Sequence, residues 1–255
     1  MRLAIIGGTG VYQLEAAHQR EPLRAETPYG SIEVWPGEMS GHEVFFLPRH
    51  GTGHTVPPHR INYRANIAGL KQFGCTAVIA TNAVGSLRES LPPASMLIPD
   101  QFIDFTRVRP LTFFDGDEGV KHVDMTEPYC PTVRQWLAAA VADEGETYER
   151  EGTYLCAEGP RFETPAEIRT FAQWGADVVG MTGLPEVVLA REAGLCYASL
   201  CLVTNFAAGI SPTPLSHREV TELMGEWDAV IEKVLASAVS RAAEAPDCPC
   251  RQPIT

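Results

Sequence analysis

Short apolar segments alternate along this chain with segments in which apolar residues recur at helical spacing. The short segments are rich in β-branched residues or bounded by Gly and Pro, which is typical of buried strands. They lie at residues 2–6, 43–47, 76–81, 95–98, 153–157, 177–180 and 196–204. Strands that alternate with helices predict an α/β fold with a central mixed sheet flanked by helices.

Helix boundaries are marked at two places by capping signals. Thr164 is a capping residue, Pro165 follows at the first helical position and Glu167 at the third, so a helix is predicted from there to about Trp174. Residues 216–219 repeat the signal, and they precede a set of apolar residues with helical spacing, namely Val220, Leu223, Met224, Trp227, Ile231 and Val234. This pattern predicts a long amphipathic helix near the C-terminus.

The size, composition and charge of the chain favour one domain that binds small molecules. With 255 residues, of which 45% are hydrophobic, the chain can bury a large core, and we expect a single domain over 1–245 with a tail at 246–255. A net charge of −12 without any Lys/Arg cluster argues against nucleic acid. Because Met1 is followed directly by the first strand, and no apolar run approaches the ~20 residues of a membrane span, we expect a cytoplasmic protein that does not contact a membrane.

The cysteines and histidines do not show the spacing of a metal site. Seven cysteines are scattered along the chain without the paired spacing of structural zinc ligands, and most are expected to be reduced core residues. Cys248 and Cys250 form either a redox pair or part of a plain tail. His50, His54 and His59 are separated by Gly and Pro residues, which prevent a helix from presenting them on one face. The sequence therefore predicts no metal ligands.

The candidate chemistry lies where the predicted strands end, which is where sites gather in α/β folds. The first strand leads into the segment 7–10 (GGTG), whose small residues let backbone N–H groups approach an anion. The alternative is that this segment is only a tight turn. It is not a dinucleotide-binding fingerprint, because the third Gly of that motif is absent. The strand at 43–47 leads into Arg49 and His50. A guanidinium has the fork geometry that phosphate needs, although Arg49 could also be a surface residue.

Three further strand ends carry hydroxyls, amides and small residues. The segments 81–86 (TNAVGS) and 181–183 (MTG) place such groups where a phosphate and a sugar could meet, although the second could equally serve only to start a helix at 185–193. The last strand ends at Asn205, whose amide offers one donor and one acceptor group, or caps a turn. Together these ends predict one polar site at the edge of the sheet.

Long motifs occur at these strand ends and between them. They are IIGGTG (5–10), PRHGTGHTVPPHRINYRANI (48–67), TNAVGSL (81–87), DQFID (100–104), KHVDMTEPYC (121–130), EGPRFETPAE (158–167), GMTGLPEVVLAREAGLCYASL (180–200) and TNFAAG (204–209). Through them residues 2–235 resemble the trimeric purine nucleoside phosphorylase family, most closely its methylthioadenosine/methylthioinosine phosphorylase branch. The resemblance implies the nucleoside phosphorylase fold.

The resemblance also implies an activity. Such enzymes cleave the N-glycosidic bond of a purine nucleoside with inorganic phosphate as co-substrate, giving free purine and a pentose 1-phosphate, without cofactor or metal. The implied phosphate-binding residues are Thr9, Arg49, His50, Asn82, Ala83 and Thr182. Because the sugar passes through an oxocarbenium-like state, the bound phosphate would both attack it and stabilise its charge.

The nucleoside side of the site follows from the same resemblance. Met181 would hold the ribose hydroxyls and Phe162 would stack near the base, while His217 occupies a position near the 5′ group. His122 would come from a neighbouring subunit of a homotrimer to close the 5′ side. The implied catalytic residues are Asn205 and Glu163 at the purine edge.

The residues at the purine edge favour a 6-oxopurine. Glu163 as a carboxylate would accept the N1–H of hypoxanthine or guanine, and Asn205 would donate to O6, where electron density develops as the purine leaves. Adenine-cleaving members of the branch carry Asp at the position of Asn205 and at that of Ala207. We therefore expect methylthioinosine, inosine or guanosine as substrate, with methylthioadenosine phosphorylase as the alternative; His217 suits a 5′-hydroxyl. From the residues alone, Glu163 is better explained as part of the N-terminal charge of the helix at 164–174, and it is the family resemblance that favours base recognition.

Two hypotheses of other classes can be weighed on the same residues. A nucleoside-binding module without catalysis has no need of Arg49, Thr182 and Asn205 together. A dehydrogenase that uses 7–10 would need the third Gly and an acidic ribose ligand, and both are missing. Purine release that requires phosphate and no nicotinamide would exclude both.

Overall fold

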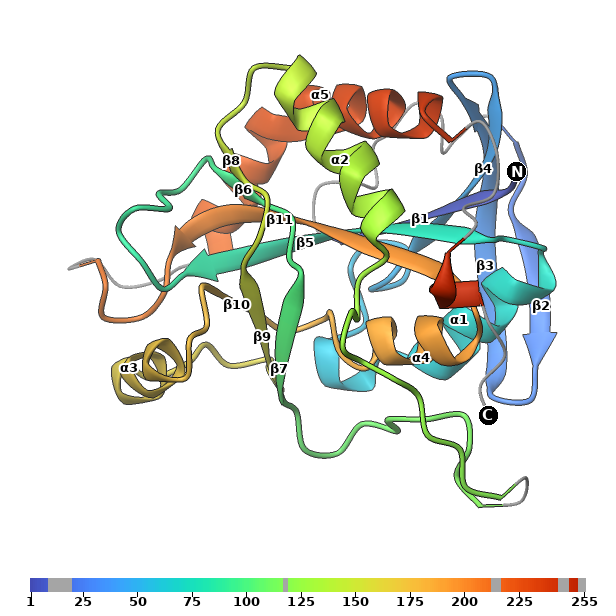
Figure 1. Ribbon diagram of the computed structural model, residues 1–255, viewed down its shortest axis with the longest axis horizontal. Helices are drawn as coiled ribbons and strands as arrows, with labels where there is room; N and C mark the ends of the chain where they lie inside the picture. Colours follow the sequence, from blue (N-terminus) through green and yellow to red (C-terminus); the bar gives the residue numbers. More distant parts are fainter. Residues whose placement is uncertain (9–19, 117–118, 212–216, 243–247, 252–255) are drawn as a thin grey trace.

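One mixed sheet forms the centre of the molecule, with helices on both faces (Figure 1). The computed structural model describes residues 1–8, 20–116, 119–211, 217–242 and 248–251. The predicted single α/β domain with a mixed sheet flanked by helices is confirmed.

The strands and helices include all those predicted and several more. The strands are β1 (Leu3–Gly7), β2 (Leu23–Thr27), β3 (Gly30–Met39), β4 (His42–Pro48), β5 (Ala77–Ser86), β6 (Met96–Leu97), β7 (Gln101–Phe105), β8 (Tyr148–Glu149), β9 (Thr153–Ala157), β10 (Val178–Gly180) and β11 (Cys196–Phe206). The helices are α1 (Tyr63–Gln72), α2 (Pro131–Asp143), α3 (Pro165–Gln173), α4 (Glu186–Glu192) and α5 (His217–Ser240).

Strand β5 is the hub of the sheet. It pairs in parallel with β1 and β11 along its first half. Its second half pairs with β11 on one side and, antiparallel, with β10 on the other, where Val178 lies opposite Ser86 and Val179 opposite Gly85. β4 is parallel to β1 on the far side. The ends of β1, β4, β5, β10 and β11 therefore meet in one region.

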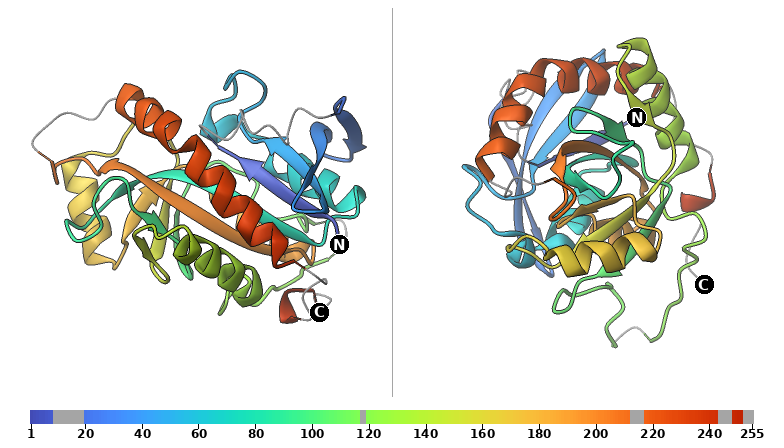
Figure 2. Two further views of the ribbon diagram at one scale, coloured as in Figure 1. Left: turned by 90° about the horizontal axis from the view of Figure 1, so that it is seen from above. Right: turned by 90° about the vertical axis from the view of Figure 1, so that its left-hand side faces the viewer.

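Both faces of the central strands are buried, which explains their continuous apolar runs. In β1, Leu3 and Ile5 belong to the core under α2 and α5, whereas Ala4 and Ile6 belong to the core under α1 and α4. Figure 2 shows α2 and α5 together on one face of the sheet. Each fully buried Leu or Ile side chain contributes about 1.5–3 kcal/mol relative to an exposed one.

The two predicted capped helices are present. Thr164 accepts a hydrogen bond from the Glu167 amide at 3.2 Å, and the Glu167 carboxylate accepts one from the Thr164 amide at 2.8 Å, which completes the capping box at the start of α3. The hydrogen bond from Arg161 lowers the pKa of Glu167 to about 2. The C-terminal helix α5 begins at His217 and continues to Ser240.

The last described residues pack against the domain. Residues 249–251 form a 3₁₀ turn, and Cys250 is buried in the core under α2 and α5. The expected domain boundary at residue 245 falls outside the described residues and stays a prediction. Among the helices that the structure describes, none combines the length and the apolar character needed to cross a bilayer.

Candidate active site

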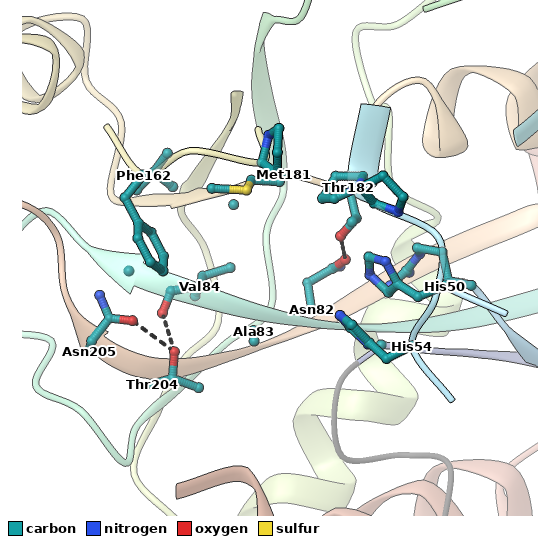
Figure 3. Close-up of a pocket in the computed structure, with 18 of the residues that line it drawn as sticks. His50, His54, Asn82, Ala83, Val84, Phe162, Met181, Thr182, Thr204 and Asn205 are labelled. Carbon is teal, nitrogen blue, oxygen red and sulfur yellow. Dashed lines mark hydrogen bonds between the residues drawn. The ribbon is translucent and has the colours of Figure 1, made fainter. Parts of the chain in front are cut away.

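A cavity of about 370 Å³ lies where the strand ends meet. In Figure 3, Phe162 and Asn205 stand at one end of it and His50 and His54 at the other, with Met181 between them. The cavity brings together most residues that the sequence singled out, namely Arg49, His50, Asn82, Ala83, Phe162, Glu163, Met181, Thr182, Asn205 and Ala207.

Three of the predicted site residues are not among these. Thr9 and the side chain of His217 lie outside the described residues. His122 is exposed and does not line the cavity. It belongs to the chain between β7 and α2, which loops away from the sheet at the bottom of Figure 1. The chain's own His122 therefore does not contribute to this cavity.

At one end of the cavity, Arg49 is held by a buried carboxylate. The Arg49 guanidinium donates to both oxygens of Glu186 at 2.8 Å and to the Thr81 carbonyl at 2.9 Å. Both charged side chains are 0% exposed. Tyr197 donates a further hydrogen bond to Glu186 at 2.7 Å. Burial alone would lower the pKa of Arg49, but the adjacent Glu186 raises it above its usual value, so Arg49 remains a cation.

The guanidinium keeps two N–H groups that have no acceptor among the hydrogen bonds of the described residues. Three of its five N–H groups go to Glu186 and Thr81, which leaves one N–H on each terminal nitrogen. A Cβ added at Gly8 would lie 3.2 Å from Arg49 Nη1 and 3.1 Å from the Thr81 carbonyl oxygen. The turn after β1 therefore approaches the guanidinium closely, and a side chain at position 8 would have to displace Arg49 or the Thr81 carbonyl slightly.

A polar network joins the turn after β10 to the middle of β5, which continues to Ser86 instead of ending near residue 81 as predicted. Thr182 donates to Asn82 Oδ1 at 2.8 Å, and Asn82 Nδ2 donates to Ser199. The buried Tyr154 hydroxyl accepts the amide N–H groups of Thr182 and Gly183 at 3.1 and 3.2 Å. These bonds fix the turn after β10 against β5.

His50 completes this end. Its Nδ1 donates to the Val56 carbonyl at 2.8 Å, and its ring stacks on that of His54 with 4.2 Å between centroids. With Nδ1 committed in this way, Nε2 can donate a hydrogen bond only when the imidazole is protonated.

At the opposite end, the amide of Asn205 is oriented by its neighbours. Thr204 donates to Asn205 Oδ1 at 3.0 Å, and Asn205 Nδ2 donates to the Phe206 carbonyl at 2.8 Å. A Cβ at Gly85 would lie 3.2 Å from Asn205 Nδ2, so the strand beside it leaves room for the amide. One N–H of the amide is still available to a ligand.

Glu163 is the unusual group at this end. It is 8% exposed, and its Oε1 has no hydrogen-bond partner among the residues that the structure describes. Burial raises the pKa of this carboxyl, and nearby Glu167 raises it further. A buried acceptor without a donor costs free energy, which a ligand with an N–H group would return.

The wall between the two ends is apolar. Met181 is half-buried, and its sulfur would lie 2.6 Å from a Cβ at Gly159, a residue with φ of +66°. Phe162 is 38% exposed and stands over the cavity near Asn205. The cavity thus has apolar side chains between its two polar ends.

Sequence reasoning missed the residues that support the site. Glu186, Tyr154 and Thr204 each hold a predicted site residue in place. Glu186 could have been suspected, because a Glu inside the apolar run of a short helix must be paired when buried. No sequence signal marks Tyr154.

Comparisons with known proteins agree with this geometry. The family model described as "Phosphorylase superfamily" matches residues 2–240. The probable 6-oxopurine nucleoside phosphorylase of Dictyoglomus turgidum is 51% identical over 252 residues, which cover 98% of this chain and 95% of that protein. The probable S-methyl-5′-thioinosine phosphorylase of Methanothermobacter thermautotrophicus is 49% identical over 254 residues, covering 98% and 87%.

Solved structures show the same fold. A methylthioadenosine phosphorylase from an antarctic soil metagenomic library has a TM-score of 0.91 at 39% identity, covering 99% of this chain and 90% of that one. The methylthioadenosine phosphorylase of Schistosoma mansoni in complex with adenine has a TM-score of 0.90 at 35% identity, covering 94% and 91%.

Proposed function

The chain belongs to the phosphorylase superfamily, and we propose that its cavity binds a 6-oxopurine nucleoside and inorganic phosphate and transfers the sugar from the purine to phosphate. Relatives of about 50% identity over nearly the full length are named 6-oxopurine nucleoside phosphorylases or methylthioinosine phosphorylases. The co-substrate is phosphate, and the reaction needs no cofactor.

The unpaired Oε1 of Glu163 is the observation that carries the choice of base. A 6-oxopurine presents N1–H, which a carboxylate accepts in a charge-assisted hydrogen bond. Adenine presents a bare N1, whose lone pair would face the carboxylate and leave it unpaired. Asn205 is also complementary to a 6-oxopurine, because its second N–H would donate to O6 and its Oδ1 would accept from a protonated N7.

One end of the cavity would bind phosphate and the other would bind the purine. Arg49, Thr182 and the Gly8 backbone would orient the phosphate dianion below the sugar. As the glycosidic bond lengthens, positive charge develops on the sugar beside the phosphate, and electron density moves into the purine. Asn205 would stabilise that density at O6. Met181 would keep water from the sugar while the phosphate oxygen attacks C1′.

The alternative is a methylthioadenosine phosphorylase, as in the solved structures of similar fold. Against it, Asn205 and Ala207 stand where adenine-cleaving members of the branch carry Asp, so this chain offers no carboxylate there to a 6-amino group. Ala207 is 2% exposed and offers no polar atom to a base. The residues at the 5′ end, where His217 is expected, do not distinguish methylthioinosine from inosine. The proposal therefore includes both nucleosides as substrates.

The direct test is a comparison of four nucleosides. We expect kcat/KM for methylthioinosine and inosine to exceed that for methylthioadenosine and adenosine by at least about 100-fold, because each mispaired buried polar group costs about 1–3 kcal/mol. Purine release is followed by absorbance with and without phosphate. A preference for methylthioadenosine, or release that needs no phosphate, would refute the proposal.

We also propose a homotrimer in which His122 completes a neighbour's site. The described parts of the chain between β7 and α2 expose Val108, Leu111 and Val120, which are 74%, 48% and 80% exposed. Large apolar side chains on a projecting segment favour a partner surface. For the location we propose the cytoplasm, since all seven cysteines are unpaired thiols in the structure.

The trimer has its own test. We expect light scattering to give three times the chain mass at micromolar concentration, and His122→Ala to raise the nucleoside KM by about 10-fold through loss of one hydrogen bond. Lys121→Ala, an exposed neighbour on the same segment, is the matched control and should behave as wild type. A fully active monomer would contradict this prediction.

A further inference from the structure

Four cysteines that are far apart in the sequence meet on the face covered by α2. Cys130 immediately precedes α2, Cys196 begins β11, and Cys248 and Cys250 belong to the last described segment. Their sulfur atoms all lie within 4.8 Å of one another. The Cys248 sulfur is 3.7 Å from that of Cys130 and 3.2 Å from that of Cys196.

This spacing is that of ligands around a single ion. Four thiolates at about 2.3 Å from a tetrahedral Zn²⁺ are about 3.8 Å apart. The sulfurs of an iron–sulfur cluster, which bind separate irons, would have to lie further apart than the spacing seen here allows. Tetrahedral sulfur coordination of one ion is typical of zinc. Small movements of the side chains would complete the geometry.

The surroundings suit a site of negative charge. Cys130, Cys196 and Cys250 are at most 5% exposed, so the sulfurs are shielded from water. Cys130 is also the N-cap of α2, where the helix dipole stabilises a thiolate. Arg191 acts electrostatically on Cys250, and its Nη1 is buried without a hydrogen-bond partner in the described part of the chain. A tetrathiolate zinc site carries two net negative charges, which this arginine would offset in part.

We propose that Cys130, Cys196, Cys248 and Cys250 bind one Zn²⁺ and that the ion fastens the C-terminal segment to the starts of α2 and β11. Each thiol releases its proton to solvent as its sulfur bonds to the metal. The remaining cysteines, Cys75, Cys156 and Cys201, pack as ordinary core residues.

The role of the ion is structural. Cys196 and Asn205 lie at opposite ends of β11, nine residues apart, which corresponds to about 30 Å of strand. Zinc at one end therefore cannot reach the nucleoside at the other. Loss of the metal should lower thermal stability without changing the chemistry of the site.

The experiment measures zinc in the full chain, expressed without a His-tag and purified under reducing conditions. Elemental analysis should give one zinc per chain for wild type and for Cys75→Ala, the matched control, and none for Cys248→Ser/Cys250→Ser. A strong chelator should lower the Tm of wild type by about 5 °C or more. kcat/KM at 25 °C should change by less than about two-fold.

A second measurement covers the case in which the double variant does not fold. Metal-free wild type titrated with Co²⁺ should bind one ion and develop the intense bands of tetrahedral cobalt bound to thiolates. Wild type that holds no zinc and binds no Co²⁺ would overturn the proposal. So would four cysteines that fail to react with a thiol reagent in denaturant because they are joined in disulfides.

Discussion

Replacement of Asn205 by Asp is expected to lower kcat/KM for inosine by about 10³-fold, because sites built on buried hydrogen bonds reject a mispaired partner strongly. The carboxylate cannot donate to O6 and would place negative charge against it. The same group can accept from the N6 amino group of adenine, so kcat/KM for adenosine should rise. The measurement is the ratio of kcat/KM for inosine to that for adenosine.

The hydrogen bonds of the Asn205 side chain indicate how an Asp would be oriented. Asn205 Nδ2 donates to the Phe206 carbonyl at 2.8 Å, and an Asp oxygen at that place would be repelled by the carbonyl. Thr204 can still donate to the other oxygen. The Asp side chain should therefore turn from Phe206 toward the base. Asn205→Ala is the control: it removes the donor without adding an acceptor, and should lower inosine cleavage without raising adenosine cleavage.

Glu163 gives an independent check on the same base. Glu163→Gln removes one charge-assisted hydrogen bond of about 1.5–3 kcal/mol, which corresponds to about 10–150-fold in kcat/KM for inosine. Since burial raises the pKa of Glu163, wild-type activity on inosine should fall as pH decreases through that raised value, and the Gln variant should lack this decline. An unchanged inosine-to-adenosine ratio in both Asn205→Asp and Glu163→Gln would refute the assignment of the base.

The fold could be predicted from the sequence where a local pattern decides the structure. The capping box at Thr164 and the apolar spacing after 216–219 are local patterns, and each predicts its helix from a short window of sequence. The strands β2, β3, β7 and β8 were missed, because none of them contains a continuous run of buried apolar residues. The antiparallel pairing of β10 with β5 depends on the packing of distant segments, which no local pattern encodes.

The residues of the candidate site could likewise be predicted only in part. Residues at strand ends, such as Arg49 and Thr182, could be placed in one cavity from the sequence, because the ends of neighbouring strands meet in α/β folds. Glu186 and Tyr154 were not found, because they act through side chains at long sequence separation. The sequence did not indicate a metal site at the four cysteines for the same reason. Three separate segments supply them, so no spacing along the chain resembles a zinc motif.

The second large effect concerns Arg49. We expect Arg49→Met to raise the KM for phosphate by about 100-fold, because the substitution removes the buried cation and leaves the Glu186 carboxylate to repel the dianion. An unpaired buried charge also costs about 3–5 kcal/mol of folding free energy, which corresponds to a decrease in Tm of roughly 6–20 °C. Phosphate kinetics and calorimetry on the same preparation measure both effects.

A double variant separates binding from folding. Arg49→Met/Glu186→Gln removes both buried charges while a Gln carbonyl can still accept from Tyr197, so most of the lost Tm should return, whereas the phosphate KM should stay high. Arg2 is the control, since it donates to Glu43 and to the Phe73 carbonyl as Arg49 does to Glu186 and Thr81, but its side chain is 52% exposed. Arg2→Met should change Tm by no more than about 4 °C and leave phosphate kinetics unchanged. Recovery of the wild-type phosphate KM in the double variant would mean that Arg49 serves only to pair Glu186.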